Sequence, residues 1–445
     1  MFRRKILDDL KSWKSRKAGK YALMIEGARR VGKSTTIEEF VKNEYRSYIL
    51  IRFEKASDEV KRLFNQMDDL DRFFLYLQQY MKTTLYDRES AIIFDEVQLY
   101  PLARQAIKVL VEDGRYDYYE TGSLISIRNN VKDILIPSEE DTMHMYPMDF
   151  EEFLWAIGDE MTMPFIRDSF DNMQPVGPDM HARIMEVYRT YMLVGGMPQA
   201  VKAFVEKNSF SEVEDVKASI LNLYQKDATK LDGKNGYKAS SLLRSLASGL
   251  ERHDKMFSPG ALRKDSSVRD YKMAIYDLGE SMMVNICYRI TDPAVDQSSH
   301  FDEDDLKIYM GDTGLLFTQS FRTLKHNVDG IYSSILSGDL NINQGMYFEN
   351  MVAQSFRASG HGLFFSKFTH HDTDRLQEVD FIITRGRSPT AVEVKSGQKT
   401  RQHKSLDRFI EKYGDSLGTS FVIHSKDLDV TPGIVYLPIY MTSLL

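Results

Sequence analysis

The stretch GARRVGKS, residues 27–34, decides the fold of the first part of this chain. It matches the phosphate-loop pattern G-x-x-x-x-G-K-[ST] without a gap or substitution. An apolar run, YALMIE, precedes it, and a helical pattern, TTIEEFVKN, follows it. This strand–loop–helix context predicts a loop whose backbone N–H groups and helix N-terminus bind an anion. The alternative is a glycine-containing turn before a surface helix, which the flanking strand and helix disfavour.

The loop residues have separate predicted tasks. Lys33 can reach the β- and γ-phosphates of a nucleotide, and the hydroxyl of Ser34 can ligate magnesium. Arg29 and Arg30 could contact phosphate or stay solvated, and the pattern does not separate these readings. We expect ATP with Mg²⁺, bound by the following loop residues: Gly27, Ala28, Arg29, Arg30, Val31, Gly32, Lys33, Ser34 and Thr35.

A second motif supports the same chemistry. SAIIFDEVQ, residues 90–98, is an apolar strand that ends in two acidic residues. We expect it beside the loop strand, where Asp95 would ligate magnesium as a Walker-B carboxylate. Glu96 would then act as the general base that polarises the attacking water. Taken alone, the segment could equally be a buried strand with a solvated acidic end.

The segment YDYYETGS, residues 116–123, ends a further predicted strand. Thr121 and Ser123 would lie near the nucleotide and could sense the γ-phosphate, although a simple glycine-containing turn explains the pattern as well. Strands alternate with helical patterns over residues 21–146. This rhythm predicts an α/β fold with a mostly parallel sheet that helices cover on both faces.

Composition limits the class of protein. The chain has 445 residues, a formal net charge of −7 and a single cysteine, Cys287. An intrachain disulfide and a cysteine-based zinc site are therefore excluded, and we expect a reducing, cytoplasmic location. No apolar run approaches the roughly 18 residues of a membrane helix, so we expect no membrane partner. The acidic balance argues against extensive coating of nucleic acid, although basic residues gather near the N-terminus and over residues 385–408.

The middle of the chain is predominantly helical. DFEEFLWAIG opens with Asp149 and Glu152 in the spacing of a capping box, and residues 176–193 form a long amphipathic pattern. Residues 237–308 suggest a winged-helix-like module, and the acidic segment 292–305 predicts an exposed loop.

The last hundred residues suggest a second site on an α/β region. Asp380 interrupts the apolar strand EVDFIIT, and Glu393 and Lys395 alternate with valines in AVEVKSG. Residues two apart on a strand share a face, and Glu349 could join them from the preceding helix. Three carboxylates suit a divalent metal, and the lysine could assist phosphodiester cleavage. A solvent-facing Glu–Lys pair on an edge strand is the more common explanation of this pattern.

Several motifs occur together in a fixed order. They are GARRVGKS, IIFDEVQ, ETGS, MYPMDFEEFLWA, VGGMPQAV, KIYMGDTGLL and the series YFEN, EVDF and EVKSG. In this order the chain resembles a family of bacterial and archaeal ATPases with an AAA-type P-loop core. Their C-terminal region is classed as a domain of unknown function and is similar to the PD-(D/E)xK restriction-endonuclease-like fold.

The resemblance implies three domains: an AAA-type ATPase core at 1–147, a helical and winged-helix-like region at 148–330, and a nuclease-like domain at 331–445. It implies ATP binding by residues 27–35, with catalysis by Lys33 and Glu96. Carried onto the C-terminal region, the nuclease pattern implies catalytic Asp380, Glu393 and Lys395, with Glu349, Asp380 and Glu393 as ligands of a second metal.

The chain departs from the family pattern in two places. IPSEED stands where many relatives have a Gly-Arg or Pro-Val-Gly sequence, which leaves Arg115, Arg128 and Arg167 as unranked candidates for an arginine finger. Val379 stands where the nuclease signature has proline, which puts cleavage in doubt.

We therefore expect an ATPase whose nucleotide state controls a C-terminal nuclease-like domain acting on DNA. The alternative is a nucleotide-dependent switch whose C-terminal domain only binds protein or nucleic acid. A third hypothesis is DNA binding through the winged-helix-like module. The sequence leaves open whether the chain forms a homo-oligomer.

Overall fold

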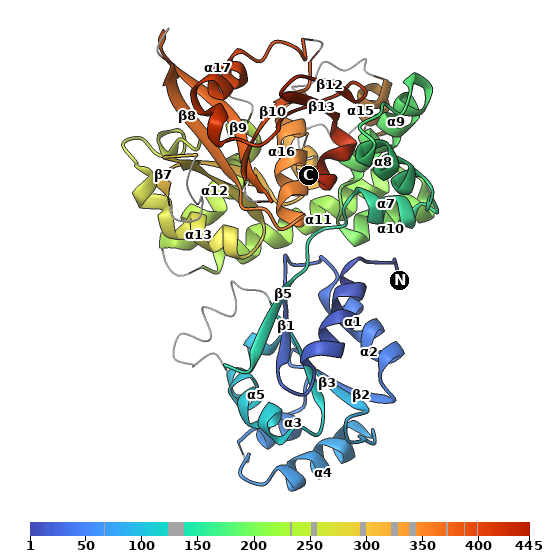
Figure 1. Ribbon diagram of the computed structural model, residues 1–445. Helices are drawn as coiled ribbons and strands as arrows, with labels where there is room; N and C mark the ends of the chain where they lie inside the picture. The colour runs from blue at the N-terminus through green and yellow to red at the C-terminus, as the bar shows by residue number, and fades with distance from the viewer. Residues whose placement is uncertain are drawn as a thin grey trace. The chain divides into compact units, whose positions relative to one another are not determined.

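The computed structural model describes residues 1–65, 67–122, 138–231, 234–250, 256–293, 300–321, 328–337, 344–370, 373–386, 388–397 and 399–445 (Figure 1). These residues form two compact units, Met1–Tyr146 and Pro147–Leu445. Each unit contains one β-sheet.

A parallel sheet forms the centre of the first unit, as the sequence predicted. Its strand order is β2-β3-β4-β1-β5, and all neighbouring strands are parallel. The strands are β1 (Ala22–Glu26), β2 (Ser47–Arg52), β3 (Ser90–Asp95), β4 (Asp117–Gly122) and β5 (Glu140–His144). The strands β1, β3 and β4 are buried along their whole length, which is typical of a parallel sheet covered on both faces.

Helices cover the two faces of this sheet. Phe40 of α2 and Leu23 of β1 belong to one apolar cluster, whereas Leu110 of α5 and Met24 of β1 belong to another. Because successive strand residues point to opposite sides, the two clusters lie on opposite faces. The helices are α1 (Ile6–Lys17), α2 (Lys33–Glu44), α3 (Asp58–Leu63), α4 (Leu70–Met81) and α5 (Pro101–Asp113), with the short η1 (Val97–Leu99).

One strand separates the two motif strands. We expected β3 directly beside β1, and this expectation was wrong, because β4 lies between them. Their motifs still meet, because the carboxyl ends of parallel strands share one edge of the sheet. Because β4 lies between β3 and β1, its end, which carries Thr121, lies between the two motifs.

The second unit begins with helices. Asp149 and Glu152 form the predicted capping box of α7, each side chain accepting a hydrogen bond from the other's backbone N–H. The helices before the C-terminal region are α7 (Phe150–Ala156), α8 (Thr162–Asp171), α9 (Pro178–Val194), α10 (Pro198–Lys207), α11 (Phe210–Thr229), α12 (Lys234–Leu250), α13 (Lys272–Glu280), α14 (Thr313–Ser320) and α15 (Val328–Ser337), with η2 (Pro259–Ala261) and η3 (Val268–Tyr271). Every described helix in the chain is too short or too polar to cross a membrane.

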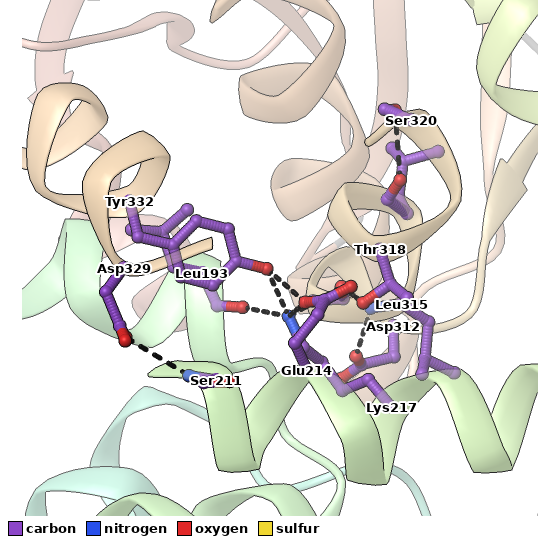
Figure 2. Close-up of polar contacts among 12 residues, drawn as sticks. Leu193, Ser211, Glu214, Lys217, Asp312, Leu315, Thr318, Ser320, Asp329 and Tyr332 are labelled. Carbon is purple, nitrogen blue, oxygen red and sulfur yellow. Dashed lines mark hydrogen bonds and ion pairs between the residues drawn. The ribbon is translucent and has the colours of Figure 1, made fainter. Parts of the chain in front are cut away.

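A buried lysine connects four of these helices (Figure 2). The Nζ atom of Lys217 on α11 donates to the backbone oxygens of Leu193 (2.7 Å) and Gly314 (3.3 Å) and to the hydroxyl of Tyr332 (2.9 Å). The carboxylate of Glu214 lies 3.1 Å from the same ammonium. These contacts compensate the cost of burying a charge, and they fix the ends of α9 and α14 against α11 and α15.

The second unit also contains a mixed sheet of eight strands. Its order is β12-β13-β11-β10-β9-β8-β6-β7. The strands are β6 (Val284–Ile290), β7 (Phe301–Met310), β8 (Phe364–His370), β9 (Thr373–Arg385), β10 (Ser388–Lys395), β11 (Ser420–His424), β12 (Asp429–Thr431) and β13 (Ile434–Pro438).

Two helices cover opposite faces of this sheet. Phe356 of α16 (Gln344–Ala358) contacts Phe381 of β9, whereas Phe409 of α17 (Lys404–Tyr413) shares an apolar cluster with Ile382. Phe381 and Ile382 are consecutive in the strand and so point to opposite sides. The short η4 (Gly414–Ser416) and η5 (Ile439–Leu444) complete the unit.

The middle strands join the C-terminal sheet. β6 pairs in parallel with β8, so the sheet crosses the predicted domain boundary at residue 330. The predicted loop at 292–305 was wrong for residues 301–305, which belong to β7. Because β7 is an edge strand, its acidic residues can stay partly exposed while its backbone pairs. Residues 294–299 lie outside the described part of the chain.

Candidate functional site

The phosphate-loop motif connects β1 to α2 through a tightly curled backbone. Arg30 and Gly32 adopt φ angles of 71° and 106°, in the left-handed region that glycine tolerates best. Gly27 has a different constraint: a Cβ atom there would lie 2.3 Å from the backbone oxygen of Met145. Glycine at position 27 therefore allows close packing against the segment after β5, whereas Gly32 allows the loop to curve.

Lys33 lies buried against this loop. Its Nζ atom donates to the backbone oxygens of Gly27 (2.7 Å) and Ala28 (3.1 Å). Burial lowers the pKa of Lys33 to about 8, although the negative charges of Glu96 and Asp95 oppose this shift. The ammonium therefore lies within electrostatic range of both acidic residues of the second motif.

The hydroxyl of Ser34 meets the Walker-B carboxylate. Oδ1 of Asp95 accepts hydrogen bonds from Oγ of Ser34 (2.5 Å) and from Oγ1 of Thr121 (2.6 Å). Nε of Arg52, at the end of β2, lies 3.8 Å from Oδ2 of the same aspartate. Three predicted site residues from three different elements thus meet at one carboxylate. Their hydroxyl and carboxylate oxygens are the hard ligands that Mg²⁺ prefers.

Glu96 lies beside this group in an unusual backbone conformation. Its φ angle is 56°, and its backbone N–H donates to Oγ1 of Thr121 at 3.1 Å. Its Oε2 atom accepts a hydrogen bond from Nε2 of Gln98 at 2.5 Å. Gln98 is buried. Gln98 ends the motif SAIIFDEVQ, but the sequence pattern indicated no role for it and none for Arg52.

The other predicted residues of this site differ in their surroundings. Val31 is buried, whereas Arg30 and Thr35 are exposed. The positive charge of Arg29 lowers the pKa of Lys33, although burial is the larger cause, so Arg29 lies within electrostatic range of it. Ser123 lies outside the described residues.

The arginine-finger candidates gain no support from their contacts. Arg115 is engaged with Asp71 (2.7 Å) and Asp113 (2.8 Å) within the first unit. Arg167 lies 3.2 Å from Glu151 within the second unit. The remaining candidate, Arg128, lies outside the described residues.

The C-terminal candidate residues come together in an arrangement that the sequence did not predict. Oε1 of Glu349 and Oδ1 of Asp380 lie 3.4 Å and 3.9 Å from Nζ of Lys307. Glu378, the first residue of the strand EVDFIIT, lies 2.6 Å from the same ammonium, and the sequence pattern indicated no role for it. Glu393 and Lys395 pair with each other at 2.7 Å. Lys307 is fully buried.

Electrostatics keep this lysine charged. Burial disfavours the ammonium, but the charges of Glu349, Glu378 and Asp380 outweigh burial and raise the pKa of Lys307 above its ordinary value. Among the residues that the structure describes, no three His, Cys, Asp or Glu side chains are grouped to hold a metal ion. Two members of the predicted metal set, Glu349 and Asp380, lie near the Lys307 ammonium, and the set of Glu349, Asp380 and Glu393 stays a prediction.

Comparison with family models divides the chain into three regions. Residues 19–154 match the family described as an AAA domain. Residues 185–324 and 344–441 match two domains of unknown function, DUF8612 and DUF4143. Most of the first unit is thus similar to AAA domains. No curated protein matches the chain.

Solved structures give weaker likenesses. A Walker-type ATPase of Pyrococcus abyssi is 16% identical, with a TM-score of 0.42, covering 72% of this chain and 96% of that one. PCH-2 of C. elegans is 9% identical, with a TM-score of 0.25 and coverages of 45% and 59%. VC1899 of Vibrio cholerae is 11% identical, with a TM-score of 0.17 and coverages of 89% and 94%. Because every TM-score is below 0.5, none of these likenesses establishes a shared overall fold.

Proposed function

We propose that the first unit binds ATP with Mg²⁺ and hydrolyses it. The observation that carries this proposal is the meeting of Ser34, Asp95 and Thr121 at one carboxylate, next to the loop that buries Lys33. The match to an AAA domain over the same residues supports it.

In this proposal the loop and Lys33 bind the phosphates. The backbone N–H groups of residues 27–35 and the positive end of α2 attract the anion, and the Lys33 ammonium exchanges its backbone carbonyl partners for phosphate oxygens. Ser34 and Asp95 would hold Mg²⁺, which when bound neutralises negative charge on the phosphates.

Glu96 would accept a proton from water as the water oxygen bonds to the γ-phosphorus. The bond from that phosphorus to the bridging oxygen then breaks, and ADP leaves with the electron pair. Gln98 holds the Glu96 carboxylate by a hydrogen bond and so orients it. Thr121 is bonded to both Asp95 and the Glu96 backbone and in this proposal would act as the sensor; Ser123 stays a prediction.

Steady-state ATP turnover with three variants tests this proposal. Lys33→Ala removes the phosphate contact and should abolish hydrolysis, whereas Glu96→Gln should keep ATP binding but lose turnover. Lys55→Ala, an exposed lysine in the same unit, is the matched control and should leave turnover unchanged. Hydrolysis that persists in Lys33→Ala would show that another site or protein is responsible.

For the second unit we propose that the C-terminal region binds protein or nucleic acid and does not cleave DNA. The nucleotide state of the first unit would control this binding. The observation that favours binding over the nuclease alternative is the ammonium of Lys307 among Glu349, Glu378 and Asp380, where cleavage would require a metal. Two of the basic residues near the C-terminus have acidic partners within the unit: Arg401 pairs with Asp429, and Lys395 pairs with Glu393.

Nuclease and binding assays separate these two functions. Purified protein should leave plasmid and single-stranded DNA intact with Mg²⁺ or Mn²⁺, in the presence or absence of ATP. Nicking that is lost in both Asp380→Ala and Lys395→Ala would instead establish the nuclease alternative. DNA retention measured in parallel, with ATP and with ADP, shows whether DNA is the ligand that is bound.

A further inference from the structure

Arg52 lies at the end of β2, directly beside the acidic motif of β3. The two strands pair in parallel, and Arg52 is the residue opposite Asp95 at the end of their register. The backbone N–H of Phe53 also donates to the backbone oxygen of Asp95 at 3.1 Å. Because the carboxyl ends of parallel strands share one edge of a sheet, the backbone fixes Arg52 at the same edge as the phosphate loop.

The guanidinium of Arg52 approaches the oxygen of Asp95 that the neighbouring hydroxyls do not use. Ser34 and Thr121 both donate to Oδ1 of Asp95, whereas Nε of Arg52 lies 3.8 Å from Oδ2. Arg52 is therefore a second cation, besides Lys33, at the acidic edge where we propose that Mg²⁺ and the phosphates bind.

The side chain of Arg52 is exposed enough to change its partner. Of this side chain, 49% is exposed to solvent, and Nη2 donates a hydrogen bond to Oε2 of Glu38 on α2 at 2.8 Å. The side chain of Glu38 is itself 35% exposed, and ion pairs between exposed side chains contribute little to stability. A guanidinium has five N–H donors in a planar fork that fits phosphate oxygens. Exchange of Glu38 for a phosphate therefore costs little.

We propose that Arg52 is a catalytic residue of ATP hydrolysis, and that its guanidinium contacts the γ-phosphate bound by the same chain. This inference rests on the proposed function of the first unit. As the water oxygen bonds to the γ-phosphorus and the bond to the bridging oxygen breaks, negative charge is spread over the γ-phosphate oxygens. Arg52 donates hydrogen bonds to these oxygens and stabilises that charge, while Glu96 accepts the proton from water. The same cation offsets the repulsion between the phosphates and the carboxylates of Asp95 and Glu96.

Binding of a transition-state analogue to the full-length protein tests this inference. Calorimetry compares Mg·ADP with Mg·ADP plus aluminium fluoride, which mimics the phosphoryl group in transfer. Arg52→Ala should bind Mg·ADP within about twofold of the wild-type protein but the analogue at least about 100-fold more weakly, and kcat should fall similarly. Arg52→Lys keeps the charge but loses the fork, and should recover part of both losses. Equal analogue affinities in the wild-type protein and Arg52→Ala would contradict the inference.

Two variants separate this contact from a structural role. Arg46→Ala is the matched control, because Arg46 lies just before the other end of β2 and makes a comparable exposed ion pair with Glu89 at 3.1 Å. It should leave analogue binding and turnover unchanged. Glu38→Gln removes the partner that Arg52 has on α2 and should also keep both. A loss in Glu38→Gln as large as in Arg52→Ala would show that Arg52 acts by holding α2, which would overturn the inference.

Mixing two inactive variants tests whether Arg52 acts within its own chain. In a mixture of Arg52→Ala and Lys33→Ala, an arginine that serves a neighbouring chain would restore hydrolysis at the intact loop of Arg52→Ala. We expect no restoration, and restored turnover would overturn the assignment to the same chain. The outcomes also separate the two proposals. A wild-type protein that binds neither Mg·ADP nor the analogue removes the proposed function, whereas tight analogue binding by Arg52→Ala removes only this inference.

Discussion

At the residue scale, Lys33 has a pKa that falls within an accessible pH range. Its pKa of about 8 in the nucleotide-free protein lies below the ordinary 10.5, chiefly because the side chain is buried. Bound phosphates favour the charged form, so nucleotide binding above that pH must take up a proton. The affinity for nucleotide should therefore fall as the pH rises through 8.

We predict that the Kd of a non-hydrolysable Mg·ATP analogue increases above pH 8 by up to about tenfold per pH unit. Isothermal titration calorimetry between about pH 7 and about pH 9 measures this dependence. Lys33→Arg keeps its charge throughout that range and should give a flat profile wherever it still binds. A flat profile for the wild-type protein would contradict the assigned contact.

Gln98 allows a second test at this scale. Its hydrogen bond to Oε2 of Glu96 should orient the carboxylate toward water, so Gln98→Ala should lower kcat by roughly tenfold or more while KM changes little. Gln98→Glu keeps the shape but replaces the donor with a second acid, and should lower kcat too. Unchanged kcat in both variants would leave Gln98 with a packing role only.

At the element scale, the first helix is anchored to the phosphate loop through one side chain. Arg4 is buried just before α1, and its guanidinium donates to the backbone oxygens of Val31 (3.1 Å) and Tyr146 (2.7 Å). These bonds connect the segment before α1, the loop and the residues after β5. Arg4 belongs to the basic N-terminal segment of the sequence, where nothing distinguished it from a solvated charge.

Arg4→Ala should lower the free energy of unfolding of the first unit by about 1–3 kcal/mol, because it leaves the Val31 carbonyl without a donor in the interior. Trp13 is buried in this unit, so its fluorescence during urea unfolding, in a Trp155→Phe background, reports this unit alone. Lys11→Ala, an exposed change on the same helix, should have little effect. Equal stabilities of the two variants would contradict the anchor.

The elements of the site were largely predictable from sequence, because their signals are local. The loop motif and the acidic strand end are each continuous in the chain, and parallel strands bring such ends to one edge. The order of the strands was not predictable in this way. Nothing in residues 90–98 indicates that β4 lies between β1 and β3, since strand order depends on long-range pairing.

The C-terminal cluster illustrates a second limit. Glu349, Asp380, Glu393 and Lys395 were recognisable from their spacing. Lys307 is the first residue of the quoted motif KIYMGDTGLL, some forty residues before Glu349, but nothing there indicated a role for it. A lysine that follows acidic residues in the sequence is ordinarily predicted to be exposed to solvent. Only the pairing of β7 with β6 makes its burial apparent.

At the scale of the whole molecule, the two compact units should respond separately to ligand and mutation. We predict two transitions in differential scanning calorimetry. Mg·ATP at about 100 times its Kd should stabilise the first unit by about 2.7 kcal/mol and shift only its transition. Lys217→Ala should lower only the other transition. A single transition that shifts with ATP would show that the units unfold together.

The one thiol of the chain has a practical consequence. Cys287 is fully buried, and burial raises its pKa well above the usual range, so it should resist maleimide reagents while the protein is folded. A cysteine introduced on the surface of each unit could then carry a fluorescent dye without background labelling. Energy transfer between two such dyes would follow, in real time, whether ATP changes the separation of the units.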